Sequence, residues 1–177
     1  GIDPPRLSIN VSPRYVEEPD FVERFVGHLE RYRIEPERIE VELTENLFIR
    51  DPASVVRKLN DLASHGIHIA IDDFGTQYSS LGYLHKFPIH TLKIDKSFVW
   101  EIDREFPQHT IIKAILSIGH GLGLNLVAEG VETEAQLKFL GSHGCHLIQG
   151  YLISKPLPPD DLEQMLLRDA TPALRAV

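Results

Sequence analysis

The stretch Ile67–Gly75 has the sequence IHIAIDDFG, and its interpretation decides the fold. Its β-branched residues predict a buried strand, and the carboxylates of Asp72 and Asp73 stand where that strand ends and a glycine turn begins. Taken alone, two aspartates before Phe-Gly are more often a turn or a helix cap than a metal site. The meaning of the pair therefore depends on whether other strands end in the same way.

Five further short apolar runs end in a residue that can hold a metal or a phosphate group. These end residues are Asn10, Glu42, Lys93, Glu129 and Gln149, and together with Asp72 they follow one another at intervals of 20 to 36 positions. A (β/α)8 barrel averages about 30 residues for each strand and helix. We expect strands near 6–11, 39–43, 67–71, 91–94, 124–128 and 145–148, alternating with helices that include 20–32, 52–65, 79–85, 110–120, 133–140 and 160–168.

The side-chain alternation of strands sharpens this prediction. Glu42 points away from Val41 and Leu43, and Lys93 points away from its apolar neighbours in the same way. In a barrel the apolar side chains would pack under the helices and the polar end residues would face the lumen. A doubly wound open sheet is the alternative fold, but it gives no reason for every strand to end in such a residue. No Gly-x-Gly-x-x-Gly follows a strand, so a dinucleotide site has no support.

The composition limits the possible partners. With 26 acidic and 18 basic residues the 177-residue chain carries a net charge of −8, which argues against a nucleic-acid polymer. A small anionic ligand stays possible if divalent cations reverse the local charge. The only cysteine, Cys145, is expected to be a buried apolar residue in a reducing cytoplasm. No apolar run approaches the ~20 residues of a membrane span, and no signal peptide is visible, so we expect no membrane contact by this domain.

The polar end residues suit a particular chemistry. Four carboxylates and one amide form an all-oxygen set, namely Asn10, Glu42, Asp72, Asp73 and Glu129. Such ligands favour Mg²⁺, Mn²⁺ or Ca²⁺ over zinc. Two such cations about 4 Å apart form the usual clamp for phosphodiester hydrolysis, and a nearby lysine could stabilise negative charge. The nine histidines show no metal spacing, and we expect them at the surface.

Six motifs follow one another in an order that is familiar. They are SINVS at 8–12, ELTE at 42–45, DDFGT at 72–76, KIDKSFV at 93–99, AEGVET at 128–133, and QGY at 149–151 leading to Lys155-Pro156. From about residue 6 to residue 168 the chain resembles the EAL domain, the cyclic di-GMP phosphodiesterase family of bacterial signalling. The resemblance implies a modified (β/α)8 barrel that hydrolyses cyclic di-GMP to linear pGpG with Mg²⁺ or Mn²⁺.

The resemblance also implies roles for individual residues. Metal ligands would be Asn10, Glu42, Asp72, Asp73 and Glu129. Lys93 would be the catalytic lysine near the attacking water, and Glu129 would also assist that water. Glu45 would anchor the loop after Asp73. Glu132 and Gln149 would support the ligands or face the substrate. A homodimer and an attached sensory or GGDEF-type domain are implied as well.

Two departures from the family pattern are visible. The Glu-Ala-Leu motif with its following Leu-Arg is absent, and we expect it, with one metal-binding glutamate, to precede Gly1. Residues 1–169 would then be the C-terminal three-quarters of the barrel, lacking its first strands and helices, and 170–177 a frayed tail. The family glycine after Thr76 is replaced by Gln77.

These departures leave alternatives open. We expect the fragment alone to be weakly active or inactive. A non-catalytic cyclic di-GMP receptor or interaction module is the main alternative, and an unrelated metal-dependent barrel, such as a lyase, is another. The expected location is the cytoplasm or the cytoplasmic portion of a membrane-anchored sensor.

Overall fold

Six parallel strands form one curled sheet in the computed structural model, which describes residues 5–48, 51–76, 84, 86–104 and 109–169. The strands are β1 (Leu7–Asn10), β2 (Ile39–Thr44), β3 (His68–Phe74), β4 (Thr91–Ile94), β5 (Asn125–Glu129) and β6 (Leu147–Gln149). Each strand pairs with the next one along the chain. A doubly wound sheet needs a point at which the strand order reverses, and the order of these six strands contains none. The predicted TIM-like barrel, present in part, is confirmed.

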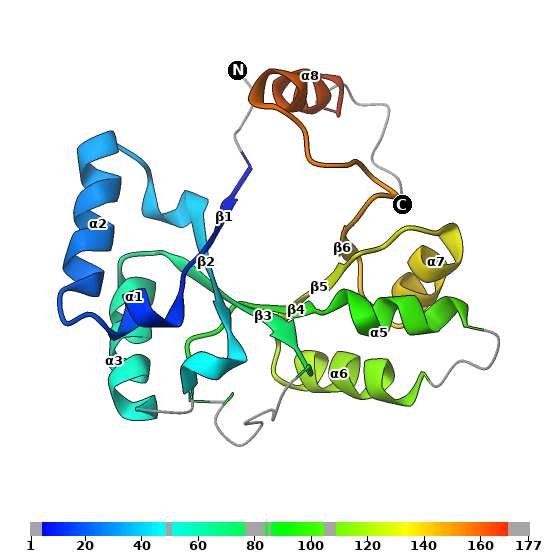
Figure 1. Ribbon diagram of the computed structural model, residues 1–177, viewed down its shortest axis with the longest axis horizontal. Coiled ribbons are helices and arrows are strands. Elements are labelled where there is room, and N and C mark those ends of the chain that lie inside the picture. The colour runs from blue at the N-terminus through cyan, green and yellow to red at the C-terminus, as the bar shows by residue number, and fades with distance from the viewer. Residues whose placement is uncertain (1–4, 49–50, 77–83, 85, 105–108, 170–177) are drawn as a thin grey trace.

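The helices connect these strands and flank the sheet. They are α1 (Pro13–Glu17), α2 (Phe21–Tyr32), α3 (Pro52–Ser64), α5 (Lys96–Trp100), α6 (Thr110–Gly121), α7 (Glu134–Ser142) and α8 (Pro159–Asp169), with 3₁₀ turns η1 (Pro36–Arg38), η2 (Glu45–Phe48) and η3 (Glu101–Asp103). Figure 1 shows α1–α3 grouped on one side and α5–α7 on the other, with α8 set apart from both groups.

Most of the expected helices are present, and two were not predicted. The expected helices are confirmed in α2, α3, α6, α7 and α8. Helices α1 and α5 each span five residues, too few for a 3.6-residue apolar period to show in the sequence. Gln77 and the tail 170–177 lie outside the described residues. Of the helix expected at 79–85, only residue 84 is described.

The apolar side chains of β2 to β5 form the core under the helices. Ile69 and Ile71 of β3 and Leu92 and Ile94 of β4 are all fully buried. Truncating one such side chain to alanine typically costs about 2–5 kcal/mol of stability. The core therefore fixes the backbone of the strands, and the opposite face of the same strands carries the polar residues.

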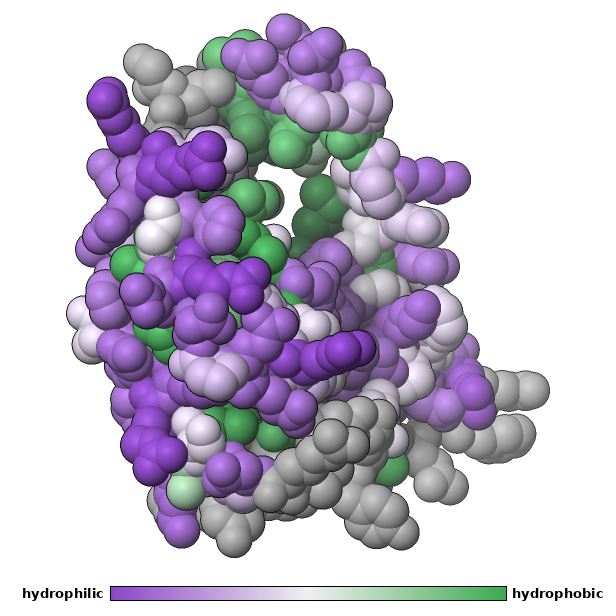
Figure 2. All heavy atoms as spheres, turned by 60° about the vertical axis from the view of Figure 1, so that its left-hand side comes forward, coloured by the Kyte–Doolittle hydropathy of each residue, from purple (hydrophilic) through white to green (hydrophobic). Residues whose placement is uncertain are grey.

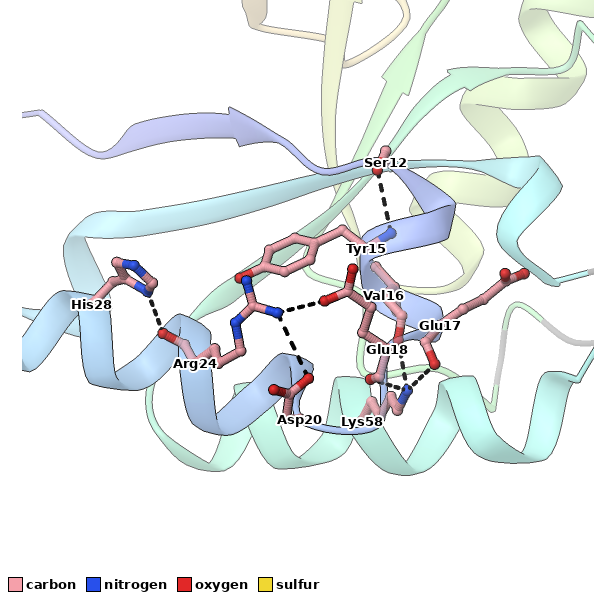
Figure 3. Close-up of polar contacts among 9 residues, drawn as sticks. All are labelled: Ser12, Tyr15, Val16, Glu17, Glu18, Asp20, Arg24, His28 and Lys58. Carbon is pink, nitrogen blue, oxygen red and sulfur yellow. Dashed lines mark hydrogen bonds and ion pairs between the residues drawn. The ribbon is translucent and has the colours of Figure 1, made fainter.

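A lysine holds α1 against α3 (Figure 3). Lys58 Nζ of α3 donates hydrogen bonds to the carbonyl oxygens of Val16, Glu17 and Glu18 at 2.7, 3.0 and 2.8 Å. These carbonyls belong to the last turn of α1, which has no intrahelical donors for them. Arg24 of α2 adds an ion pair to Glu18 at 2.6 Å. The three helices are thereby fixed as a unit beside the end of β1.

The sheet is open along both edge strands. Leu7 of β1 is 61% exposed and Leu147 of β6 is 52% exposed. Apolar side chains such as Leu157 and Leu162 are also exposed near α8, and Figure 2 shows apolar atoms around the opening beneath that helix. None of the helices in the described ranges combines the length and the apolar character needed to cross a bilayer.

Candidate active site at the carboxyl ends of the strands

Lys93 lies at the centre of a cluster formed by four neighbouring strands. Its Nζ atom is 2.8 Å from Glu42 Oε2, 3.1 Å from Asp72 Oδ1 and 2.7 Å from Glu129 Oε1. Lys93 is 5% exposed and Glu42 is 6% exposed, so these charges meet largely out of water. The structure thus brings together four side chains from β2, β3, β4 and β5 that are far apart in the sequence.

The three carboxylates of this cluster outnumber its single ammonium group, that of Lys93. Burial alone would lower the pKa of Lys93, but its hydrogen bonds to Glu129 and Glu42 outweigh burial and raise that pKa above its ordinary value. Burial raises the pKa of Glu129, and the negative charges of Asp72 and Glu42 act in the same direction. The lysine therefore stays protonated, and the carboxylates around it still lack positive charge.

A bulge places Asp73 beside Asp72. Adjacent residues of a regular strand point to opposite faces. Here the register between β3 and β4 shifts after Ile71, and Asp73 has a left-handed backbone with φ +53°. As a result, single oxygen atoms of Asp72, Asp73 and Glu129 all lie within 4.8 Å of one another. Bulges of this kind are frequent next to active sites because they redirect a side chain.

Asp95 is a member of the site that sequence reasoning missed. It follows the end of β4, and its carboxylate acts on Asp73 at short range. Burial raises the pKa of Asp73, and the charges of Asp72 and Asp95 raise it further. Its position two residues after Lys93, just past the end of β4, was the available signal.

Glu45 holds the loop that follows the two aspartates. Its Oε1 atom accepts a hydrogen bond from the backbone N–H of Gly75 at 2.6 Å. Gly75 has φ +94°, a conformation that a side chain would strain. Glu45 begins the turn directly after β2, so β2 supplies one residue to the charge cluster and one to the loop beside it.

A cavity of about 720 Å³ opens next to Glu129. Glu132 and Gln149 both line it, and so do Lys96, Trp100, Tyr151 and Lys155. Gly150 forms part of its wall, where a Cβ atom would lie 2.1 Å from the carbonyl oxygen of Val131. A volume of this size lies within the usual range for small-molecule sites.

Asn10 lies at the other edge of the site. It ends β1, directly opposite Glu42 in the parallel register of the two strands, and its side chain is exposed. The six strand ends singled out in the sequence thus occur on consecutive strands. Glu42, Asp72 and Glu129 each contact Lys93.

The expectation that the histidines lie at the surface is wrong for His68 and His90. Their rings are 4.5 Å apart and half-buried, and the backbone N–H of Ile69 donates to His90 Nδ1 at 3.2 Å. They belong to a second polar layer at the amino ends of the strands. In that layer buried Glu40 accepts a hydrogen bond from the Thr91 hydroxyl at 2.6 Å.

Cys145 is buried, as expected, and burial raises the pKa of its thiol to about 11.

The donor set fits a hard divalent cation. Asp72, Asp73 and Glu129 offer carboxylate oxygens within a space that one ion or a close pair of ions could fill. Oxygen-only ligands suit Mg²⁺, Mn²⁺ and Ca²⁺. Burial, and then neighbouring carboxylates, raise the pKa of Asp73 and of Glu129, and a bound cation would oppose both effects.

Comparison with known proteins places the chain among bacterial signalling proteins. The family model of the EAL domain matches residues 2–156. A cyclic di-GMP phosphodiesterase of Pseudomonas aeruginosa is 39% identical over 165 residues, which are 93% of this chain and 28% of that protein. MucR of the same organism, a bifunctional diguanylate cyclase/cyclic di-GMP phosphodiesterase, is 39% identical over 88% of this chain and 23% of its own length.

Solved structures agree with this placement. The cyclic di-GMP complex of the MucR phosphodiesterase superposes with a TM-score of 0.84, covering 89% of this chain and 64% of that chain at 39% identity. The manganese and cyclic di-GMP complex of BlrP1 from Klebsiella pneumoniae has a TM-score of 0.76 and 33% identity, covering 85% of this chain and 39% of that chain. The chain spans about a quarter of the length of the two Pseudomonas aeruginosa relatives, the cyclic di-GMP phosphodiesterase and MucR. From the family match and the shared fold together, the chain belongs to the EAL domain family.

Proposed function

We propose that this chain carries most of the active site of a cyclic di-GMP phosphodiesterase, which hydrolyses one phosphodiester bond to give linear pGpG. The observation that carries the proposal is the buried ammonium group of Lys93 within 3.1 Å of carboxylates from three other strands, with Asp73 beside them. The phosphodiesterase relatives and the cyclic di-GMP complexes of similar structures support the choice of substrate.

The metal would be Mg²⁺ or Mn²⁺, held by Asn10, Glu42, Asp72, Asp73 and Glu129. Divalent cations in such a site lower the pKa of a bound water and neutralise charge on the phosphate. The BlrP1 complex with manganese supports this assignment. The all-oxygen character of the five side chains supports it independently.

Two residues would act on the reacting atoms. Water attacks the phosphorus, and the bond from phosphorus to one ribose oxygen breaks. Glu129 accepts a proton from the attacking water, because its carboxylate lies in the cluster with Asp72 and Asp73 where that water would bind. The Lys93 ammonium lies 2.7 Å from Glu129, where it stabilises negative charge on the attacking oxygen or on the phosphate. The departing ribose oxygen takes its proton from solvent.

The cavity beside Glu129 would take part of the nucleotide. Glu132 and Gln149 line it and would face the substrate, and Lys96 and Lys155 add positive charge to its wall. We further propose a homodimer and an attached sensory or GGDEF-type domain in the cytoplasm. The bifunctional character of MucR supports the attached domain.

A turnover assay tests the function. The intact protein is incubated with cyclic di-GMP and MnCl₂, and pGpG is separated by liquid chromatography. We expect pGpG to form, EDTA to prevent its formation, and Glu129→Gln to abolish it. Binding of cyclic di-GMP without any pGpG would contradict the enzyme and favour a receptor.

The fragment is tested in the same assay. The 177-residue chain alone should turn over poorly, because the family's Glu-Ala-Leu glutamate is not among its residues. Robust turnover by this chain would contradict that expectation.

A further inference from the structure

Two hydrogen bonds join the segment after Lys93 to the segment after Glu129. Trp100, the last residue of α5, donates from Nε1 to the carbonyl oxygen of Gly130 at 3.1 Å. Thr133 donates from its hydroxyl to Asp103 Oδ2 at 2.9 Å. The turn that follows β5 is therefore held at both ends by α5 and η3.

The turn and the helix also pack at close range. Gly130 has φ +65°, and a Cβ atom at this position would lie 2.5 Å from Lys96 Cβ. Lys96 Nζ lies 5.4 Å from the centroid of the Trp100 ring, which is a cation–π distance. Gly130 is thus required twice, by its backbone conformation and by the proximity of α5.

This arrangement bears on the site through chain connectivity. Lys93 is three residues before the start of α5, and Glu129 directly precedes Gly130. The register between β4 and β5 extends to Ala128, and the register between β5 and β6 continues one residue further, pairing Glu129 with Gln149. Glu129 is thus held by strand pairing on its β6 side. On its β4 side, where Lys93 lies 2.7 Å away, the turn after Glu129 is held by α5 instead.

We propose that residues 96–103, which we call the α5–η3 brace, are the positioning element that holds Glu129 against Lys93. Within the brace, Trp100 and Asp103 are positioning residues that act through Glu129. The inference rests on the proposed function, because Glu129 is there both a metal ligand and the base. An ordinary surface hydrogen bond would alter stability and leave metal affinity and kcat unchanged.

Two variants test the brace against a matched control. Trp100→Phe keeps an aromatic ring and removes the donor, and Asp103→Ala removes the second acceptor. Tyr32→Phe alters a 65% exposed aromatic residue at the end of α2 and serves as the control. Residues that orient metal ligands typically contribute about 10- to 100-fold to affinity or activity. For each brace variant we expect the chain to bind Mn²⁺, titrated as MnCl₂ by calorimetry, roughly 10-fold more weakly. In the intact protein we expect kcat to fall about as much and KM to stay within about 2-fold.

A double variant separates positioning from general stability. If Trp100 acts through Glu129, then adding Trp100→Phe to Glu129→Gln should change Mn²⁺ affinity by less than about 2-fold. In the 177-residue chain Trp100 is the only tryptophan, so its indole N–H gives a single NMR cross-peak when this chain is studied by itself. That N–H should exchange slowly with solvent in the unaltered chain and faster in Asp103→Ala.

The outcomes distinguish the brace from the function. Brace variants that match Tyr32→Phe in both Mn²⁺ affinity and kcat would overturn the brace, even if pGpG forms. An effect of Trp100→Phe that persists undiminished in the Glu129→Gln background would also overturn it. Weakened Mn²⁺ binding in the brace variants, with no pGpG from any protein, would support the brace and refute the phosphodiesterase.

Discussion

At the scale of single residues, Lys93 is the position where charge and burial are most closely linked. Without a metal, its ammonium group is the main positive charge facing Glu42, Asp72 and Glu129. Its hydrogen bonds to two of these carboxylates are what keep it protonated despite burial. One side chain thus serves both the stability of the strand ends and the proposed chemistry.

Lys93→Ala should separate those two roles. Removing one partner of a buried ion pair leaves uncompensated charge, so we expect the metal-free protein to lose about 3–5 kcal/mol of unfolding free energy. Losing a group that stabilises developing charge should lower kcat by about 10²–10³-fold. Mn²⁺ should still bind and should restore much of the lost stability.

Urea unfolding with and without MnCl₂, together with the pGpG assay, measures these effects. Lys138→Ala, an exposed lysine of α7, is the matched control and should change neither quantity. An unchanged rate in Lys93→Ala would remove Lys93 from the mechanism.

Asp73 shows the limit of reasoning from alternation. A regular strand would point Asp72 and Asp73 to opposite faces. The bulge after Ile71 and the positive φ of Asp73 bring both carboxylates to the same group of oxygens. Nothing in the local sequence announces the bulge, because it depends on how β4 pairs with β3.

At the scale of elements, the strands carry one polar layer at each end. The carboxyl-end layer holds the charge cluster. The amino-end layer contains His68, His90 and Glu40, where burial lowers the pKa of both histidines below the ordinary value. Arg6 lowers the pKa of both histidines further, and Glu40 acts in the opposite direction.

The histidine layer should make the fold sensitive to acid. Because both pKa values are lowered on folding, the unfolded chain binds more protons once the pH falls below about 6.5. This contribution to stability is therefore complete above that pH and decreases as the pH falls towards the lowered values. Urea unfolding at about pH 7 and about pH 5 should show a smaller loss for His90→Gln than for the unaltered chain.

An exposed histidine provides the control for this measurement. His146→Gln should retain the unaltered pH dependence, since His146 is exposed ahead of β6. Equal losses of stability in all three proteins would show that the layer does not titrate in this range.

The short helices matter more than their length suggests. The five residues of α5 follow β4 after one intervening residue, Asp95, and their contacts reach the turn after β5. Because they form little more than one helical turn, hydrophobic periodicity cannot detect them. The position of α5 is decided by its contacts with residues 130–133, the turn after β5.

At the scale of the whole molecule, the sheet gathers negative charge at one end and leaves two edges open. The strand order places Glu42, Asp72 and Glu129 around Lys93, with Asp73 adjoining. The open edges at β1 and β6 expose Leu7 and Leu147, which is a known liability for association through strand pairing.

Metal binding should therefore stabilise the whole fold. A ligand at 100 times its Kd adds about 2.7 kcal/mol, which for a domain of this size corresponds to a rise in Tm of roughly 5–10 °C. Thermal unfolding in MnCl₂ and in EDTA measures the shift. Asp72→Asn should show a smaller rise, and KCl at matched ionic strength should produce none. Equal Tm values in MnCl₂ and EDTA would contradict a metal site.

The sequence by itself determined the parallel strand–helix pattern, because apolar periodicity, caps and turn glycines are local signals. It also indicated which strand ends carry polar groups, since alternation within one strand separates Lys93 and Glu42 from their apolar neighbours. Only the tertiary structure decided which of these groups touch. The ion pairs of Lys93, the bulge that turns Asp73, the charge of Asp95 beside it and the hydrogen bond from Trp100 to Gly130 all depend on the register between strands. That register is set by core packing across the sheet, and no local segment contains it.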